Sequence, residues 1–413
     1  MRNGGRGRIL VALLTALFGC GERPGAPASV EVTVSDSAGV ARVTITGSVL
    51  DLPQWALSAT PVVEIDGASP PFLGSVGEVE LLSDGRLLVE DEQSHELYLF
   101  GANGEPLRRV GGRGEGPGEF LNLTELSLAA GDTAYAYDRR LYRITEFDPT
   151  GGLVSTVRVG REFAGEGTLV LDGWGFDSDH LLIHVMGPPD SSAAPRLPRR
   201  DQRDALLFPL DGSGLARSAP RRFAGGYSIE GERFDAPAPF ANRPIVAVGA
   251  DRVVRGSGLR YELFVETRDL DVERIIRWDG WRLPLSDSLL RAVRDTVDAG
   301  FEKLRAVRPD LVRSLMDAEF SEDLLPDTLP ALGAALVDDR GRIWVARFRP
   351  STDRWKQEDS WHVLAPDGHP LARVALPGRA RLAAVRDDHV ALIVRDELDV
   401  EHVRVFELAP SGP

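Results

Sequence analysis

The chain has 413 residues, of which 43% are hydrophobic, and it carries a formal net charge of −15. An acidic chain repels the phosphate backbone, so nucleic acid is not expected as a partner. Cys20 is the only cysteine, which excludes a framework of internal disulfides. The 43 glycines and 28 prolines suit many short strands joined by turns.

The first twenty residues have the layout of an export signal. Three arginines precede an apolar run, residues 9–18, which only Thr15 interrupts. This run is too short to span a bilayer, and its order of charge, apolar stretch and small residue is that of a signal peptide. We therefore predict that residues 1–19 are a signal peptide and that the remaining chain is exported.

Residues 17–20, Leu-Phe-Gly-Cys, resemble the lipobox of bacterial lipoproteins. The resemblance implies that Cys20 is lipidated and that its acyl chains anchor the protein to a membrane. The residue after the cysteine is Gly21 and not Asp, which in Gram-negative lipoprotein sorting implies the outer membrane. The alternative is an ordinary secretory signal with an incidental cysteine. Residues 20–38 are then predicted to be a flexible tether.

A unit of four short strands recurs along the rest of the chain. Its clearest copy spans residues 76–111, with turns at Asp84-Gly85 and Asn103-Gly104. The next copy spans residues 123–159. Later copies follow at residues 168–223, at 244–278, from Ala334 onward and at 381–408. Repeats of 40–50 residues with four strands each are typical of propeller blades.

The count of six copies predicts an all-β, six-bladed β-propeller over residues 39–410. A closed ring needs its last blade completed by a strand from the other end of the chain, which removes exposed sheet edges. Residues 61–65 are our candidate for that strand. A helical insertion is predicted at residues 286–319, between blades four and five, with Ser286 or Asp287 as its cap and Pro309 as a break. It either packs beside the propeller or covers one face.

Residues 112–120, Gly-Arg-Gly-Glu-Gly-Pro-Gly-Glu-Phe, are similar to a signature of bacterial six-bladed β-propeller proteins related to NHL repeats. Residues 338–345 also resemble the NHL pattern of Asp, Gly and an apolar strand. The resemblance covers about residues 55–408. It implies the fold, and it carries over no catalytic residue.

The glycines at 112–118 do not form a dinucleotide fingerprint, because Pro117 and Glu119 stand where a third glycine is needed. One interpretation is a connection between two blades, in which glycine permits unusual backbone angles and Pro117 stiffens the chain. The other is a backbone nest that binds an anion. Arg113, Glu115 and Glu119 are the candidate binding residues of this segment.

Motifs for catalysis and metal binding are missing from the sequence. His180 and His184 are separated by a predicted strand of about 13 Å, too far for one zinc ion. Neither His-Glu-x-x-His nor Gly-x-Ser-x-Gly occurs. We therefore predict no catalytic residue, metal ligand or cofactor. Three tryptophans in the fifth copy, Trp344, Trp355 and Trp361, suit core packing, or a sugar or peptide surface if they are exposed.

The function expected from the sequence is a membrane-tethered, non-catalytic binding or scaffold propeller. It would present a rigid face to a protein, a peptide or a glycan. The alternative is a divalent-cation-dependent hydrolase or lyase of the six-bladed type, which resemblance to six-bladed lactonases suggests. Because a fold does not define a function, the choice depends on a site.

Overall fold

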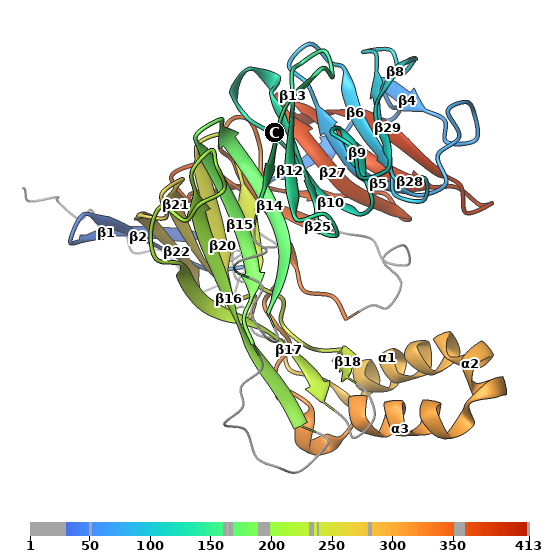
Figure 1. Cartoon of the computed structure of the whole chain (residues 1–413). Coiled ribbons are helices and arrows are strands. Elements are labelled where there is room, and N and C mark those ends of the chain that lie inside the picture. The colour runs from blue at the N-terminus through green and yellow to red at the C-terminus, as the bar shows by residue number, and fades with distance from the viewer. Residues whose placement is uncertain are drawn as a thin grey trace, which may run out of the picture.

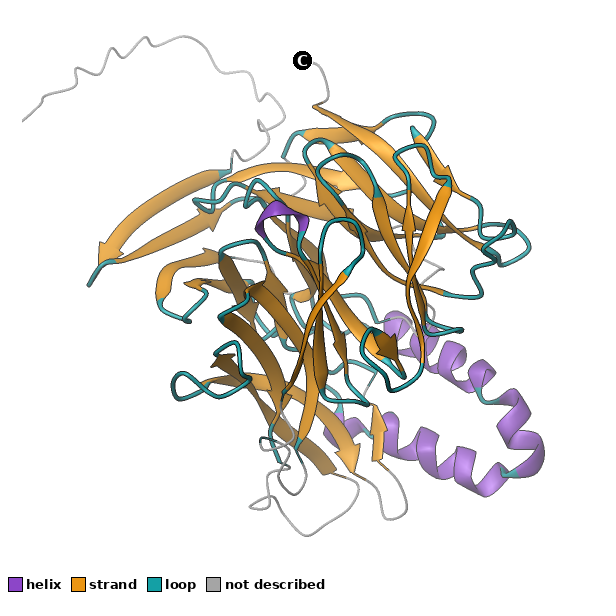
Figure 2. Cartoon of the chain, turned by 45° about the horizontal axis from the view of Figure 1, so that its top comes forward, coloured by secondary structure: helices purple, strands orange, loops and turns teal. Residues whose placement is uncertain are grey.

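The computed structural model describes residues 30–48, 52–159, 163, 168–188, 199–230, 235–237, 239–279, 283–350 and 360–410. Within them the chain forms six blades of mainly antiparallel strands, of which the last two are joined in one sheet, and a helical arm (Figures 1 and 2). The predicted six-bladed β-propeller with a helical insertion is confirmed. The predicted signal peptide, Cys20 and Trp355 lie outside the described residues.

The first three blades follow one another along the chain. Blade one comprises β5 (Val76–Leu81), β6 (Leu87–Asp91), β7 (Glu96–Phe100), β8 (Pro106–Arg113) and the short β9 (Glu119–Phe120). Blade two comprises β10 (Leu123–Leu128), β11 (Ala134–Asp138), β12 (Arg143–Phe147) and β13 (Leu153–Arg158), with a short 3-10 helix at Ala130–Asp132. Blade three comprises β14 (Leu169–Asp177), β15 (His180–Met186), β16 (Arg199–Leu210), β17 (Arg221–Glu230) and β18 (Asp235–Pro237).

The last three blades complete the ring. Blade four comprises β19 (Ile245–Val248), β20 (Arg252–Gly256), β21 (Glu262–Thr267) and β22 (Val272–Trp278). Blade five comprises β23 (Leu332–Val337), β24 (Ile343–Arg347), β25 (Ser360–Leu364) and β26 (Pro370–Ala375). Blade six comprises β27 (Ala380–Arg386), β28 (His389–Arg395), β29 (Glu401–Pro410) and β4 (Val63–Ile65).

The hydrophobic core is divided into clusters between neighbouring blades, because each blade buries the apolar residues of both faces. Between blades two and three, Tyr135 and Tyr137 of β11 lie against Gly175 and Gly173 of β14. A Cβ atom on either glycine would collide with the facing tyrosine ring. The sheets therefore approach closely at this point because glycine leaves room for the rings.

The ring is closed by an N-terminal strand, as the sequence predicts for residues 61–65. Strand β4 pairs antiparallel with β29, and Arg404 Nε lies 2.8 Å from Glu64 Oε1. The turn at Gly104 has φ +85, and a Cβ atom there would collide with the carbonyl oxygen of Glu64. A further strand, β3 (Gln54–Leu57), pairs with both β26 and β29 and joins blades five and six. The N-terminal segment thus seals the ring twice.

The prediction of a tether over residues 20–38 is wrong for its last part. Strands β1 (Glu31–Ser37) and β2 (Val40–Thr46) form a hairpin, and β2 pairs in parallel with β22 of blade four. Ala38 and Gly39 both have positive φ, as a tight hairpin turn requires. Most of β1 is exposed, and it is held by backbone pairing with β2 and by Val32, which packs against the core between blades four and five.

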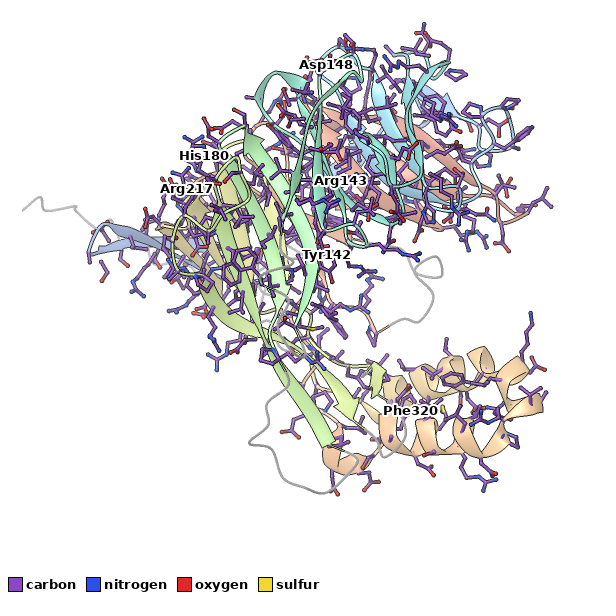
Figure 3. The ribbon with its side chains drawn as sticks, in the orientation of Figure 1. Tyr142, Arg143, Asp148, His180, Arg217 and Phe320 are labelled. Carbon is purple, nitrogen blue, oxygen red and sulfur yellow. The ribbon has the colours of Figure 1, made fainter. Side chains whose placement is uncertain are left out.

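The helical insertion forms an arm with its own core. Its helices are α1 (Asp287–Gly300), α2 (Glu302–Val307) and α3 (Pro309–Glu319), followed by a 3-10 turn at Glu322–Leu324. As predicted, Ser286 caps α1 by accepting a hydrogen bond from Leu289 N, and Pro309 opens α3. Phe320, labelled in Figure 3, packs in this core with Val293, Val312 and Met316.

The arm extends away from the ring beside β17 and β18 (Figure 1). None of its described residues lines the central channel. Of the two interpretations of the insertion, packing beside the propeller therefore describes it better than covering one face. Among the described helices, none has the length and hydrophobicity needed to cross a membrane.

Candidate functional site

A central channel runs where the first strands of the six blades meet. It encloses a cavity of about 580 Å³. Residues of β5, β10, β14, β19, β23 and β27 line it, so every blade contributes to its wall. A cavity of this size lies within the range of small-molecule sites in proteins. The channel is therefore our principal candidate site.

The charged residues of the channel are segregated by blade. All three acidic residues that line it come from blades one and two: Glu78, Glu80 and Glu125. The basic residues that line it come from blades five and six or from the segment just before β19: Arg243, Arg347, Arg349 and Arg381. Trp174 of blade three and Trp361 of blade five contribute aromatic surface. The channel thus has an acidic half and a basic half.

The glutamates of the acidic half hold protons more tightly than exposed glutamates. Burial, followed by the negative charge of Glu78, raises the pKa of Glu80 to about 8. Burial also raises the pKa of Glu125, with further contributions from Glu78 and Asp172, although a hydrogen bond from the Trp174 side chain acts in the opposite direction. The acidic half therefore does not carry its full negative charge near neutral pH, and a nearby cation would restore it.

The arginines of the basic half have different surroundings. Arg381 donates from Nη2 to the carbonyl oxygens of Val76 (3.1 Å) and Gly77 (2.9 Å), which links blade six to blade one. Burial, together with the charge of Arg349, lowers the pKa of Arg347. Arg243 is exposed, and its guanidinium makes no hydrogen bond or ion pair with the described residues. Arg243 is thus available to an anionic ligand.

A second cavity, of about 660 Å³, lies beside the channel and is called here the blade-three cavity. It shares Glu125, Trp174, Arg243 and Val246 with the channel, so the two spaces adjoin. The rest of its wall comes mainly from β14, β15, β16, β17 and the segment 241–244. Its polar residues are treated below.

In the glycine-rich segment between blades one and two, the turn is occupied by the carboxylate of Glu119. Glu119 Oε2 accepts a hydrogen bond from Gly116 N at 2.8 Å, and a Cβ atom on Gly114 would collide with the same carboxylate. Arg143, at the start of β12 and labelled in Figure 3, donates to the backbone carbonyl of Glu119 and, at 2.9 Å, to that of Glu115. The loop is thus a nest-like turn occupied by a side chain of this chain.

The three candidate residues of that segment do not converge. Arg113 and Glu115 are exposed, whereas Glu119 is half-buried and turned into the loop. The geometry agrees with the interpretation of a connection between blades. The hypothesis that Arg113, Glu115 and Glu119 bind a ligand stays a prediction with no contact among them to support it.

The histidines of β15 each pair with a separate carboxylate. His180 Nδ1 lies 2.8 Å from Asp177 Oδ1, and His184 Nδ1 lies 3.2 Å from Asp172 Oδ2. Over the described parts of the chain, no three His, Cys, Asp or Glu residues are grouped so that they could hold a metal ion. Trp344 is fully buried and donates to Asp338, which matches core packing.

The charged residues of the channel were not identified from the sequence. They lie in or beside the strands nearest the channel axis, as single charges within apolar stretches, for example Glu78-Val79-Glu80 in β5. Charged residues at alternate positions in the first strand of a repeat are the signal that could have revealed them. Whether such residues face one another depends on how the blades close, which one sequence does not show.

The fold and its closure define this chain as a six-bladed β-propeller. The model of a family described as "6-bladed beta-propeller" matches residues 71–177, which span blades one and two and the start of blade three. No curated protein is detectably similar in sequence.

Among solved structures, a putative exported protein from Bacteroides fragilis is 13% identical, with 90% of this chain and 100% of that chain covered and a TM-score of 0.50. A member of the DUF4221 family from Bacteroides vulgatus is 12% identical, with 92% and 98% covered and a TM-score of 0.43. A calcium-binding protein, regucalcin, from Agrobacterium tumefaciens is 10% identical, with 87% and 97% covered and a TM-score of 0.38. At these identities the likeness concerns the fold alone.

Proposed function

We propose that the protein is a non-catalytic binding module of the cell envelope that holds its ligand in the central channel. The observation that carries the proposal is the segregation of charge, with Glu78, Glu80 and Glu125 on one side and four arginines on the other. A ligand in the channel meets both halves, so the best match is a molecule with a cationic and an anionic group.

A short peptide has this chemistry, since it can present an ammonium group to the glutamates and a carboxylate to the arginines. Trp174 and Trp361 add flat apolar surface for the rest of such a ligand. Peptide is one of the three ligand classes expected from the sequence, and the paired charges favour it. The described residues offer no metal-binding group in support of a divalent-cation enzyme.

The cellular location of the protein is proposed from its N-terminal sequence. The signal peptide over residues 1–19 and the lipobox-like residues before Cys20 support export and a lipid anchor, with Gly21 in favour of the outer membrane. The similar protein from B. fragilis is itself described as a putative exported protein. Mass spectrometry of the mature protein tests this part, because an unmodified Cys20 on the mature chain would contradict the anchor.

Calorimetric titration with N-acetyl-Lys-Ala tests the binding proposal. Its side-chain ammonium and terminal carboxylate are the two charges that the channel is proposed to bind. We expect binding to weaken by about ten-fold when either charge is removed, by acetylation of the amine or amidation of the carboxylate. Equal binding of all three peptides, or no binding of any, would contradict the proposal.

Two matched pairs of variants test whether the peptide binds in the channel. Glu80→Gln and Arg349→Gln each remove one channel charge, and we expect each to weaken binding. Glu105→Gln and Arg260→Gln remove exposed charges outside the channel, and we expect no change. Loss of binding in the second pair as large as in the first would show that the peptide binds elsewhere.

A further inference from the structure

The blade-three cavity contains two buried polar atoms for which the described residues supply no hydrogen-bond partner. They are Nε2 of His184 and Oδ1 of Asn242. Both residues line the cavity, and they are only 3% and 1% exposed. A buried polar atom without a partner is costly and is usually satisfied in a functional state. Two such atoms at one cavity therefore point to a ligand.

The hydrogen bonds of these two side chains define what the ligand must supply. Asp172 lies 3.2 Å from His184 Nδ1, so the proton of a neutral imidazole belongs on Nδ1 and Nε2 is an acceptor. Asn242 Nδ2 donates to the carbonyl oxygens of Gly225 (2.7 Å) and Ser257 (2.8 Å), which fixes the amide orientation and leaves Oδ1 as an acceptor. Both atoms therefore require a hydrogen-bond donor.

Two free cations also line this cavity. Arg139 and Arg243 are exposed, and neither guanidinium makes a hydrogen bond or ion pair within the described part of the chain.

Three carboxylates line the same cavity, but each is already engaged or protonated. Asp172 faces His184 Nδ1, Asp204 pairs with Arg222, and burial raises the pKa of Glu125. The two free guanidinium groups therefore disfavour an ammonium donor, because they repel it, and favour a carboxylate. The donors that reach the two acceptors are thus better supplied by neutral hydroxyl groups.

We propose that the blade-three cavity binds an acidic sugar. Its hydroxyl groups would donate to His184 Nε2 and Asn242 Oδ1, and its carboxylate would bind Arg139 and Arg243. This site is distinct from the peptide site proposed in the channel, although the two share Glu125, Trp174, Arg243 and Val246.

Calorimetric titration with a uronic acid disaccharide tests the proposal. The matched neutral disaccharide has the hydroxyl groups without the carboxylates, and succinate has carboxylates without hydroxyl groups. We expect the uronic acid disaccharide to bind at least about ten-fold more tightly than either. Binding of succinate with equal affinity would show that only the two arginines bind the ligand, which would contradict a sugar site. Absence of binding by all three compounds would also overturn the proposal.

Variants separate this site from the channel and from effects on folding. Arg139→Gln is expected to weaken binding of the uronic acid disaccharide by about ten-fold, whereas Arg140→Gln, at the adjacent exposed residue outside the cavity, is expected to leave it unchanged. Glu80→Gln, in the channel alone, should affect the peptide and not the sugar. Equal losses in the Arg139 and Arg140 variants would contradict the assignment.

His184→Phe distinguishes a binding role from a structural role. Phenylalanine keeps a ring against Phe223, which stacks on His184 with centroids 6.5 Å apart, and removes the acceptor at Nε2. It also removes the partner of Asp172, whose carboxylate is 32% exposed and can be hydrated instead. We expect sugar binding to fall about ten-fold without a decrease in the thermal unfolding midpoint. A protein that is destabilised while its sugar affinity is unchanged would show that His184 serves the fold.

Discussion

Blade one and blade four each bury a glutamate, but only blade four supplies a full counter-charge. Glu266 in β21 is fully buried, with Arg255 Nε and Nη2 at 3.0 and 2.8 Å from its two oxygens and Arg221 Nε at 3.4 Å. Glu90 in β6 is 2% exposed, and its one described hydrogen bond comes from Glu78 N. Its other oxygen has no partner among the described residues.

The two blades thus show two kinds of buried charge. The glutamate of blade four has a counter-charge, whereas that of blade one has none among the described residues. Arg255 also packs over the rings of Phe264 and Phe223, and its hydrogen bonds and charge oppose the rise that burial gives to the pKa of Glu266. Blade one instead places Glu90 near Glu78, whose charge adds to the effect of burial and raises the pKa of Glu90 to about 8. Carboxyl groups thus gather behind and along the acidic half of the channel, where a bound cation would favour their ionised form.

The largest effect is expected when the compensated pair is broken. Arg255→Leu would leave Glu266 buried with only the more distant Arg221, and we expect a loss of about 3–5 kcal/mol in the free energy of unfolding. Denaturant unfolding at pH 7 measures this loss. The double variant Arg255→Leu with Glu266→Leu is the control and should recover most of it, because no buried charge remains. A loss below about 1 kcal/mol in the single variant would contradict the assigned role.

The next largest effect should have the opposite sign. Glu90→Gln removes a carboxyl group whose pKa is raised from 4.5 in the unfolded chain to about 8 in the folded one. The wild type loses stability as pH rises between these two values, because only the unfolded chain releases the proton. The variant does not, so we expect it to be more stable than the wild type by roughly 2–4 kcal/mol at pH 8.

Denaturant unfolding of the wild type and Glu90→Gln at pH 5 and pH 8 checks this prediction. The two proteins should differ little at pH 5, which is the internal control. A difference that stays constant with pH would show that Glu90 is ionised throughout, and the contrast between blades one and four would disappear.

A smaller effect is expected on ligand affinity. The ammonium of N-acetyl-Lys-Ala binds the ionised acidic half, and the pKa of Glu80 is raised to about 8, so binding must displace a proton at lower pH. We expect affinity to rise about ten-fold from pH 6 to pH 8 and the dependence to shrink in Glu80→Gln. Calorimetry in buffers of different ionisation enthalpy would detect the released proton. An affinity independent of pH would place the ammonium elsewhere.

The smallest effect concerns the pair that joins the closing strand to blade six. The side chains of Glu64 and Arg404 are 45% and 33% exposed, so water screens their attraction. We expect Glu64→Gln to change the free energy of unfolding by less than about 1 kcal/mol. A loss comparable to that of Arg255→Leu would mean that burial does not decide which charges matter to this fold.

Much of the fold follows from local signals in the sequence. Turns such as that at Gly104 mark the strand pairs, and Ser286 and Pro309 mark the beginnings of two helices. The closing strand at residues 61–65 follows from the requirement that a ring leave no open edge. The pairing of the hairpin of β1 and β2 could not be foreseen in this way, because β2 joins a blade that lies more than two hundred residues away in sequence.

The candidate sites are less accessible to sequence reasoning. The glycine-rich segment attracted attention because it is locally unusual, yet Glu119 fills its turn from within. The channel combines Glu80 of the first blade with Arg349 of the fifth, and the blade-three cavity combines Arg139 with Asn242. Such sets arise only when the blades close, and no spacing in one sequence encodes them.

The most direct test of the central claim is a crystal structure of the protein with N-acetyl-Lys-Ala bound. We predict that the ligand lies in the channel, with its ammonium nitrogen about 3 Å from a carboxylate of Glu78, Glu80 or Glu125 and its carboxylate against the arginines of the basic half. A ligand bound outside the channel, or bound with the two charges reversed, would contradict the account.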